Sequence, residues 1–134
     1  MLFGDEHIKR YEETDGAEGH EWQGTTALIL ATTGRKSSQQ RKSALIYQKY
    51  GQDYLVVASK GGAPEPPAWY LNLESDPEVQ VQVLGDKFRA HARTATAAEK
   101  PGMWEVMAKA WPAYNDYQKK TSREIPVVVL ERES

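Results

Sequence analysis

The stretch TTALILATTGRKSSQQRKSALIYQKYGQDYLVVAS, residues 25–59, contains the pattern that decides the fold of this chain. It holds three apolar or alternating segments (25–33, 41–50 and 53–59), separated by a polar loop at 34–40 and by the two-residue turn Gly51–Gln52. Segments of this kind are typical of buried or half-buried β-strands, and a two-residue link is typical of a hairpin. The stretch therefore predicts three consecutive strands.

Elsewhere along the chain, similar patterns predict three more strands and several helices. Helices are indicated by capping spacing, by prolines near their starts and by apolar residues four apart. The expected strands lie at 79–83, 87–93 and 125–130. A leading helix is expected at 5–14, and a second helix from Pro66–Pro67 to the residue before Asp76. A third helix, through Met103, Met107 and Trp111, starts either after the capping pair Thr96 and Glu99 or at Pro101, and it restarts after Pro112. About six short antiparallel strands with inserted helices predict a mainly β fold (α+β), a small barrel.

Length and composition are those of one globular domain. We expect the 134 residues to form a single unit, with the leading helix in residues 1–15 and the barrel in residues 25–132. The chain has no cysteine, which excludes disulfides, thiolate nucleophiles and sulfur-ligated metals. Its first residues are acidic, unlike a signal peptide, and no apolar run approaches the roughly 18 residues of a membrane span. We therefore expect a soluble cytoplasmic protein that does not associate with membranes.

The net charge of −2 conceals an uneven distribution of charge along the chain. Residues 1–21 carry seven acidic and two basic residues, whereas no acidic residue lies between Glu21 and Asp53. A segment this one-sided produces a local positive potential whatever the total charge, so we expect an anionic partner. The basic residues of this interval are Arg35, Lys36, Arg41, Lys42 and Lys49.

The loop between the first two predicted strands, GRKSSQQR at residues 34–41, is the strongest local signal for a ligand. Three cationic side chains, two hydroxyls and two side-chain amides follow a glycine at the bend. Arginine grips an oxyanion in a fork, lysine adds a point charge, and loop N–H groups add donors. The loop therefore predicts binding of phosphate or carboxylate, with an ordinary solvated basic turn as the alternative.

Two further segments are candidates for contacting a flat ligand. In SKGGAP, residues 59–64, the paired glycines allow the backbone to approach a ring closely, although a simple glycine turn explains them too. Its spacing matches neither a P-loop nor a dinucleotide fingerprint. Trp111, Tyr114 and Tyr117 have helical spacing, which suits either a flat wall with proton donors or core packing. Trp69 is open to the same two interpretations.

Several other chemistries lack support in the sequence. His7, His20 and His91 have no metal-ligand spacing, so we expect no metal site. There is no nucleophile-elbow motif and no carboxylate pair in an apolar setting. The basic loop contains no aromatic residue, which argues against single-stranded nucleic acid as a partner.

Together, the three ligand segments resemble the deazaflavin-dependent nitroreductase family. The matching text is LILATTGRKSSQQR at 28–41, YLVVASKGGAPEPPAWYLNL at 54–73 and PAYNDYQKKTSREIPVVVLE at 112–131, and the resemblance extends over nearly the whole chain from about His7. It implies a split β-barrel of the FMN-binding type and the cofactor coenzyme F420, whose phosphate and polyglutamate tail suit the basic loop. The family more often has glycine where Ser38 stands and proline where Gln40 stands.

The resemblance also implies which residues contact the cofactor and the substrate. The basic loop would bind the phosphate and tail, the glycine segment would lie along the deazaflavin, and the tyrosines would line the substrate side. The implied cofactor-binding residues are Arg35, Lys36, Ser37, Ser38, Gln39, Arg41, Ser59, Lys60, Gly61, Gly62, Ala63, Pro67, Trp69 and Asn72, and the implied catalytic residues are Tyr114 and Tyr117, with Trp111 beside them.

The implied activity is that of an oxidoreductase, which transfers hydride from the reduced deazaflavin to a small electron-poor acceptor such as a quinone, a nitroaromatic or an enone. Tyr114, Tyr117 or water would supply a proton or a hydrogen bond to the developing anion. An FMN-dependent oxidoreductase of the same barrel type and a non-catalytic cofactor-binding protein are the alternatives. The cation pairs 35–36 and 41–42 favour an anion longer than FMN. A homodimer stays open, because relatives with this barrel often pair.

Overall fold

The computed structural model describes residue 2 and residues 4–133, and its main feature is one eight-stranded sheet in which every pair of neighbouring strands is antiparallel. The strand order is β1-β2-β6-β7-β8-β5-β4, and β3 pairs with β2 outside this path. The strands are β1 (Glu21–Trp22), β2 (Thr25–Thr33), β3 (Gln40–Ile46), β4 (Gln48–Tyr50), β5 (Asp53–Val57), β6 (Glu78–Val83), β7 (Asp86–Thr94) and β8 (Val127–Arg132).

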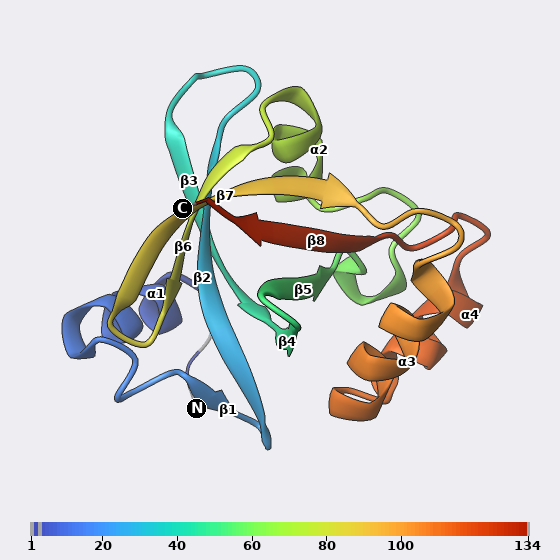
Figure 1. Cartoon of the computed structure of the whole chain (residues 1–134), viewed down its shortest axis with the longest axis horizontal. Coiled ribbons are helices and arrows are strands. Elements are labelled where there is room, and N and C mark those ends of the chain that lie inside the picture. The colour runs from blue at the N-terminus through green and yellow to red at the C-terminus, as the bar shows by residue number, and fades with distance from the viewer. Residues whose placement is uncertain (1, 3, 134) are drawn as a thin grey trace.

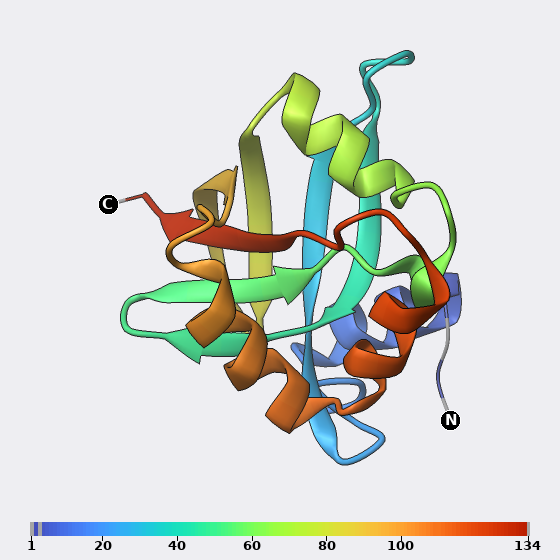
Figure 2. The same ribbon diagram turned by 90° about the vertical axis from the view of Figure 1, so that its right-hand side faces the viewer.

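The sheet is strongly curled, so that its two ends form crossing layers around a core. Figure 2 shows β2, β3 and β6 aligned along one axis, with β5 and β8 crossing in front of them. Apolar side chains from both layers meet in the gap, among them Leu28 of β2, Val56 of β5 and Leu130 of β8, all fully buried. The predicted mainly β fold with helices is confirmed, and each of the six expected strands is present.

The strands predicted from the sequence differ from those of the structure in two places along the sheet. The segment expected as one strand at 41–50 is broken at Tyr47, because this buried ring packs into the core and its hydroxyl is 2.8 Å from His20 Nε2. The break separates β3, which pairs with β2, from β4, which pairs with β5. The short strand β1 was not predicted. It folds back on β2 through Gln23 and Gly24, both with positive φ (50° and 83°), as a two-residue hairpin requires.

Four α-helices surround the sheet, close to the predicted positions: α1 (Gly4–Thr14), α2 (Ala68–Ser75), α3 (Lys100–Ala110) and α4 (Ala113–Lys120). The capping pair before α3 is formed in both directions, since Glu99 N–H donates to Thr96 Oγ1 (3.2 Å) and Thr96 N–H donates to Glu99 Oε1 (2.9 Å). Figure 1 shows α1 on one side of the sheet and α3 and α4 together at the other end. None of the helices within the described residues is long and apolar enough to cross a bilayer.

Helix α1 is anchored to the sheet through one buried tyrosine. The Tyr11 side chain is fully buried, its hydroxyl donates to the Ala27 carbonyl (3.0 Å), and it accepts from the Leu84 N–H (2.8 Å). Burial raises the pKa of the Tyr11 hydroxyl to about 12. The helix therefore depends on a neutral phenol that joins β2 to the turn after β6.

We expect Tyr11→Phe to lower the free energy of unfolding by about 1–3 kcal/mol, because the buried Ala27 carbonyl and the partly buried Leu84 N–H would lose their partner. Since the folded-state pKa is raised from 10 to about 12, the wild-type contribution is complete below pH 10 and is lost as the pH rises through 12. Urea denaturation measures both effects. Tyr50→Phe, at a tyrosine that is 42% exposed, is the control and should change stability by less than about 0.5 kcal/mol. Equal stabilities of the two variants would contradict the anchoring role.

Candidate functional site

The basic loop and helix α2 enclose a cavity of about 280 Å³, which we call the basic pocket. Arg35 and Lys36 come from the loop between β2 and β3, and Arg41 comes from the start of β3. The floor of the pocket comes from α2. It is lined by Gly34, Arg35, Lys36, Ser37, Arg41, Ser43, Ala68, Trp69 and Asn72.

The loop is closed by its own backbone and tied to the helix below it. Gly34 N–H donates to the Gln39 carbonyl and Ser38 N–H donates to the Gly34 carbonyl, both at 2.8 Å. Ser38 has a φ of 59°, a left-handed conformation that glycine adopts more easily. Asn72 of α2 accepts from the Arg35 N–H (3.1 Å) through Oδ1, so this amide holds the base of the loop.

The cations of the basic pocket are not neutralised by neighbouring acids. Within the described residues, no carboxylate lies within 4.0 Å of the charged atoms of Arg35, Lys36 or Arg41. Lys42, by contrast, forms an ion pair of 2.6 Å with Glu12 of α1. Arg41 and Lys42 were expected to bind the anion together, as a second pair of cations. This prediction is wrong for Lys42, because its side chain lies on the outer face beside α1.

A second cavity, of about 380 Å³, adjoins the basic pocket at Trp69, which lines both. We call it the aromatic pocket. It lies between the edge of β3, the segment after β5 and the α3–α4 junction. It is lined by Trp22, Ala44, Leu45, Ile46, Val57, Ser59, Lys60, Gly61, Pro67, Trp69, Trp111, Tyr114 and Tyr117.

The segment after β5 forms an unusual left-handed turn at one wall of the aromatic pocket. Lys60, Gly61 and Gly62 have φ values of 46°, 63° and 85°, so three consecutive residues are left-handed. Gly62 N–H donates to the Ser59 carbonyl (2.9 Å), which closes the turn. Left-handed backbone at a non-glycine residue such as Lys60 costs free energy and persists only where the surrounding structure enforces it.

Arg123, in the link between α4 and β8, stabilises this turn through hydrogen bonds to its carbonyl groups. Its Nε donates to the Ala63 carbonyl (2.9 Å), and one terminal nitrogen donates to the carbonyls of Ser59 (2.9 Å) and Ala58 (3.3 Å). The turn also touches α4 directly, because a Cβ at Gly62 would lie only 2.6 Å from the Tyr117 carbonyl oxygen. The turn and the tyrosine helix are therefore packed as one unit.

Two hydroxyls of the aromatic pocket are available to a ligand. Tyr114 is 5% exposed, and its hydroxyl makes no hydrogen bond to any residue in the described part of the chain. In the described part of the chain, Thr25 Oγ1 is the one side-chain polar atom that is both fully buried and without a hydrogen-bond partner. The Tyr114 hydroxyl, which also has no partner, is therefore not fully buried and can be reached from the cavity. The buried Ser59 side chain lines the same cavity. Burial and the nearby Tyr117 raise the pKa of Tyr114 above the usual value for tyrosine, which keeps it protonated as a donor.

The two pockets together contain most of the residues that the sequence predicted for the site. Four predicted residues do not line them: Ser38 and Gln39 shape the basic loop, and Gly62 and Ala63 complete the left-handed turn. Trp22, whose ring centroid lies 5.8 Å from that of Trp111, was not predicted from the sequence, and neither was Arg123. The sequence signals Arg123 only as a cation that precedes the last strand.

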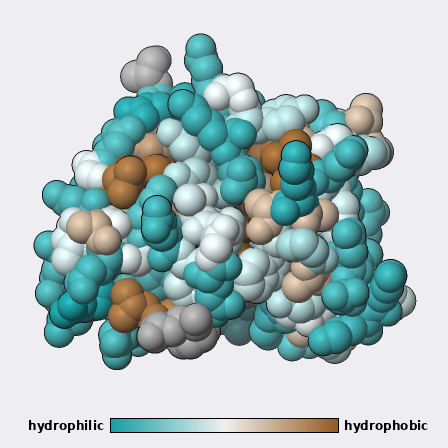
Figure 3. Space-filling model, turned by 90° about the horizontal axis from the view of Figure 1, so that it is seen from below, coloured by the Kyte–Doolittle hydropathy of each residue, from teal (hydrophilic) through white to brown (hydrophobic). Residues whose placement is uncertain are grey.

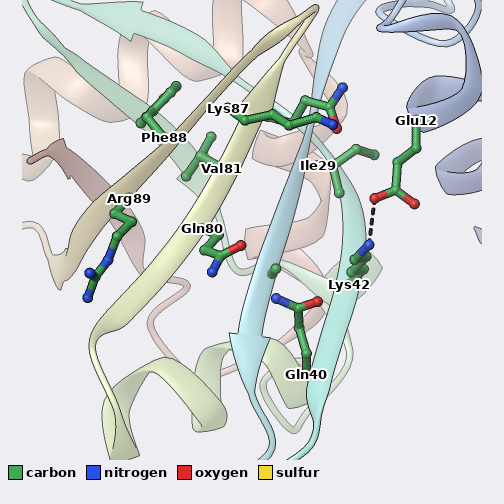
Figure 4. Close-up of a pocket in the computed structure, with 11 residues that line it drawn as sticks. Glu12, Ile29, Gln40, Lys42, Gln80, Val81, Lys87, Phe88 and Arg89 are labelled. Atoms are coloured by element: carbon green, nitrogen blue, oxygen red, sulfur yellow. Dashed lines mark hydrogen bonds and ion pairs between the residues drawn. The ribbon is translucent and has the colours of Figure 1, made fainter.

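A larger cavity, of about 440 Å³, lies beside α1 on the outer face of β2, β6 and β7 and contains none of the predicted site residues. Figure 4 shows its polar lining, with the Glu12–Lys42 ion pair at one side and Gln80 on β6. Phe88 is the one aromatic residue in its lining, and two of its three cations, Lys42 and Arg89, form ion pairs with Glu12 and Glu133. The basic and aromatic pockets, which contain the predicted residues, are therefore the candidate functional site.

Comparisons with known proteins identify the family of the chain. A family model described as F420H(2)-dependent quinone reductase matches residues 4–132. The F420H(2)-dependent quinone reductase Rv1261c of Mycobacterium tuberculosis is 40% identical over 130 residues, which cover 94% of this chain and 87% of that protein. A solved structure described as an F420-H2 dependent reductase (FDR-A) is 37% identical with a TM-score of 0.73, over 78% of this chain and 93% of that one. Another, described as a domain-swapped dimer, is 35% identical with a TM-score of 0.76, over 94% and 95% of the two chains.

The fold and the comparisons define a deazaflavin-dependent oxidoreductase on a split β-barrel, as the resemblance implied. The chain belongs to the F420H(2)-dependent quinone reductase family. It is accordingly an F420H2-dependent reductase, and the predicted cofactor, coenzyme F420, is confirmed.

We expect Gly62→Ala to lower the free energy of unfolding by about 1–3 kcal/mol and to weaken F420 binding, because the new methyl group would push the turn away from α4 and strain a left-handed residue. Denaturation and fluorescence titration measure the two effects. The matched control is Gly102→Ala in α3, where no atom lies within 4 Å of the added Cβ. The control should stabilise the helix by up to about 1 kcal/mol. Wild-type stability of Gly62→Ala would show that the contact is not tight.

Proposed function

We propose that this protein reduces quinones with F420H2, which binds across the basic and aromatic pockets. The observation that carries the proposal is the junction of the two cavities at Trp69. One cavity offers cations without acidic partners, and the other offers flat aromatic walls with free hydroxyls. A cofactor with a flat ring and a long anionic arm needs this combination, whereas a solvated basic turn would not adjoin an aromatic cavity.

The residues present fit the cofactor part by part. The phosphate and tail would be bound by Arg35, Lys36 and Arg41, through forked and point-charge contacts. The ring would lie against Gly61, whose missing side chain faces open space, since no atom lies within 4 Å of a Cβ placed there. Trp69 would cover the ring where the cavities meet. When bound, reduced F420 supplies the hydride.

The protein's own residues then orient the acceptor and stabilise the charge that develops on it. The walls of the aromatic pocket, including Trp111 and Ile46, exclude water and hold a flat acceptor against the ring. A quinone oxygen gains negative charge as its ring accepts hydride, and the Tyr114 hydroxyl donates a hydrogen bond to that oxygen. A hydrogen bond from a largely buried hydroxyl such as that of Tyr114 is stronger than the same bond in water. Tyr117, at the more open side, donates the second hydrogen bond.

A quinone is the proposed acceptor because its two carbonyl oxygens suit two hydroxyl donors on one wall. The names of the family and of its Mycobacterium tuberculosis relative support the same class. Nitroaromatics and enones present similar electron-poor centres, and a parallel acceptor screen ranks the three classes. The similar structure described as a domain-swapped dimer supports a homodimer, which we propose for this chain.

We expect the protein to bind F420 and to bind FMN more weakly, as measured by fluorescence titration with each cofactor. Arg35→Ala and Lys36→Ala should each weaken F420 binding about 5- to 50-fold, because each removes a charge-assisted contact. Added salt should weaken wild-type binding as well. Lys49→Ala removes the same charge from an exposed site on β4 and should leave binding unchanged. Binding of FMN in place of F420 would refute the proposed cofactor arrangement.

We expect Tyr114→Phe to lower kcat for quinone reduction about ten- to a hundredfold while F420 affinity stays unchanged, because only the developing charge loses a donor. Since the pKa of Tyr114 is raised above 10, this hydroxyl stays protonated up to at least that pH. The wild-type rate should therefore show no loss from Tyr114 ionisation between pH 7 and 10. Steady-state kinetics of Tyr114→Phe and Tyr117→Phe measure each donor. Unchanged turnover in both would exclude the hydroxyls from the reaction.

A further inference from the structure

The basic loop between β2 and β3 carries a serine whose hydroxyl has no structural partner. Figures 1 and 2 show this loop projecting beyond the body of the sheet, where a second protein can reach it. Ser38 lies within the loop and is exposed, and its hydroxyl makes no hydrogen bond to any of the residues that the structure describes. The Ser37 hydroxyl, by contrast, already accepts from the Gln39 N–H (3.2 Å). Ser38 therefore presents a free hydroxyl on an accessible loop.

The backbone of Ser38 is in a conformation that a serine adopts at a cost. Its φ of 59° lies in the left-handed region, where glycine is favoured. Two hydrogen bonds enforce this conformation, because Gly34 N–H donates to the Gln39 carbonyl and Ser38 N–H donates to the Gly34 carbonyl. A glycine would fit this backbone with less strain, so the hydroxyl at this position requires a role of its own.

The residues before Ser38 have a charge pattern that suits a protein kinase with an acidic substrate groove. Arg35 and Lys36 stand three and two positions before the serine, and cations there pair with the acidic residues of such a groove. Ser122 follows two lysines at the same spacing, so the charge pattern alone does not single out Ser38. The difference is their surroundings, since Ser38 belongs to the loop that forms the basic pocket and Ser122 lines neither pocket.

A phosphate on Ser38 would meet cations that have no acidic partner. Arg35, Lys36 and Arg41 form no ion pair with any carboxylate of the described residues. The stem of Arg41 passes the base of the loop, since its Cγ lies 3.7 Å from the position of a Cβ on Gly34. Phosphoserine carries about two negative charges at neutral pH and three acceptor oxygens, which suit forked contacts with arginine. The same cations are assigned above to the phosphate and tail of F420, so the two anions would exclude each other.

Control by a docked protein has less support on the face that Figure 3 shows. On this face, seen from below Figure 1, hydrophobic side chains form small separate patches on a mainly hydrophilic surface. Larger contiguous apolar patches are the ones that mark a site for a stable protein partner. Modification of a projecting loop needs no such surface, because the kinase leaves after one transfer.

We propose that Ser38 is a phosphorylation site and that its phosphate, bound by the cations of the basic pocket, closes this pocket to F420, a regulatory role that rests on the cofactor site proposed above. In the transfer, Ser38 Oγ forms a bond to the γ-phosphorus of ATP while the bond from that phosphorus to the bridging oxygen of ADP breaks. ADP leaves, and the hydroxyl proton passes to a basic group of the kinase and then to water. Nothing is oxidised or reduced.

The test treats the protein with ATP and the catalytic subunit of cyclic-AMP-dependent protein kinase, which selects serines that follow basic residues. Every sample carries Ser122→Ala, which removes the second serine with this charge pattern. Mass spectrometry should place a phosphate on Ser38, and fluorescence titration should then give an F420 affinity at least about tenfold below that of the untreated protein. A phosphatase should restore the original affinity. Ser38→Gly suits the left-handed backbone and lacks the hydroxyl, so its affinity should be the same before and after kinase treatment.

Phosphorus NMR of the phosphorylated protein tests the contact with the cations without F420. The phosphoserine signal should shift in Arg41→Ala, which lies outside the charge pattern before Ser38, and should stay in place in the matched control Lys49→Ala, at an exposed residue of β4. Absence of phosphate from Ser38, unchanged F420 affinity after phosphorylation, or a signal that ignores Arg41→Ala overturns the proposal. Failure of the untreated protein to bind F420 would instead count against the proposed function, while the NMR signal still decides whether the pocket binds the phosphate.

Discussion

The contact between Gly62 and the backbone of α4 is the constraint on which the site depends. A Cβ at this position would lie 2.6 Å from the Tyr117 carbonyl oxygen, so the left-handed turn and the tyrosine helix approach as closely as two backbones can. Arg123 bonds to three carbonyls around the turn and so keeps it in a conformation that Lys60 would not adopt alone. The distance between the wall that we propose meets the cofactor and the wall that we propose meets the acceptor is therefore set by packed backbone rather than by flexible side chains.

Charge is distributed so that the pocket cations stay available. None of the described acidic residues near the N-terminus lines the basic pocket. Glu12 pairs with Lys42 on the outer side of β3, and Glu18 pairs with Arg10. Arg35 and Arg41 thus keep their charge for an anion, although the chain as a whole carries a net charge of −2. Total charge says little about what such a protein binds, because a cavity responds to the nearest few charges within a Debye length of roughly 8–10 Å.

Local patterns in the sequence predicted the four α-helices and every strand except β1, because alternation and capping are encoded within a few neighbouring residues. Local pattern also singled out the basic loop, whereas the other residues of the two pockets were implied mainly by the resemblance to the family. Contacts across the chain were beyond such patterns. Arg123 bonds to carbonyls 60 and 64 positions away, and Trp22 meets Trp111 only because the sheet curls. The break at Tyr47 follows from core packing and not from local propensity. Lys42 resembles its neighbour Arg41 in sequence, yet the two alternate in direction along β3 as strand geometry requires.

Among the residues that the structure describes, no strand pairs with the second edge of β3, and this open edge leaves room for the pocket in which we propose that the cofactor ring binds. Closing the barrel would pair that edge with another strand and remove the space now occupied by the aromatic pocket. An open edge exposes N–H and C=O groups and invites pairing with other chains. Charged side chains on an edge strand oppose such pairing, and β3 carries Arg41 and Lys42 at its start. Arg41 therefore serves two requirements at once, since it protects an edge that must stay open and lines the basic pocket, which adjoins the aromatic pocket at Trp69.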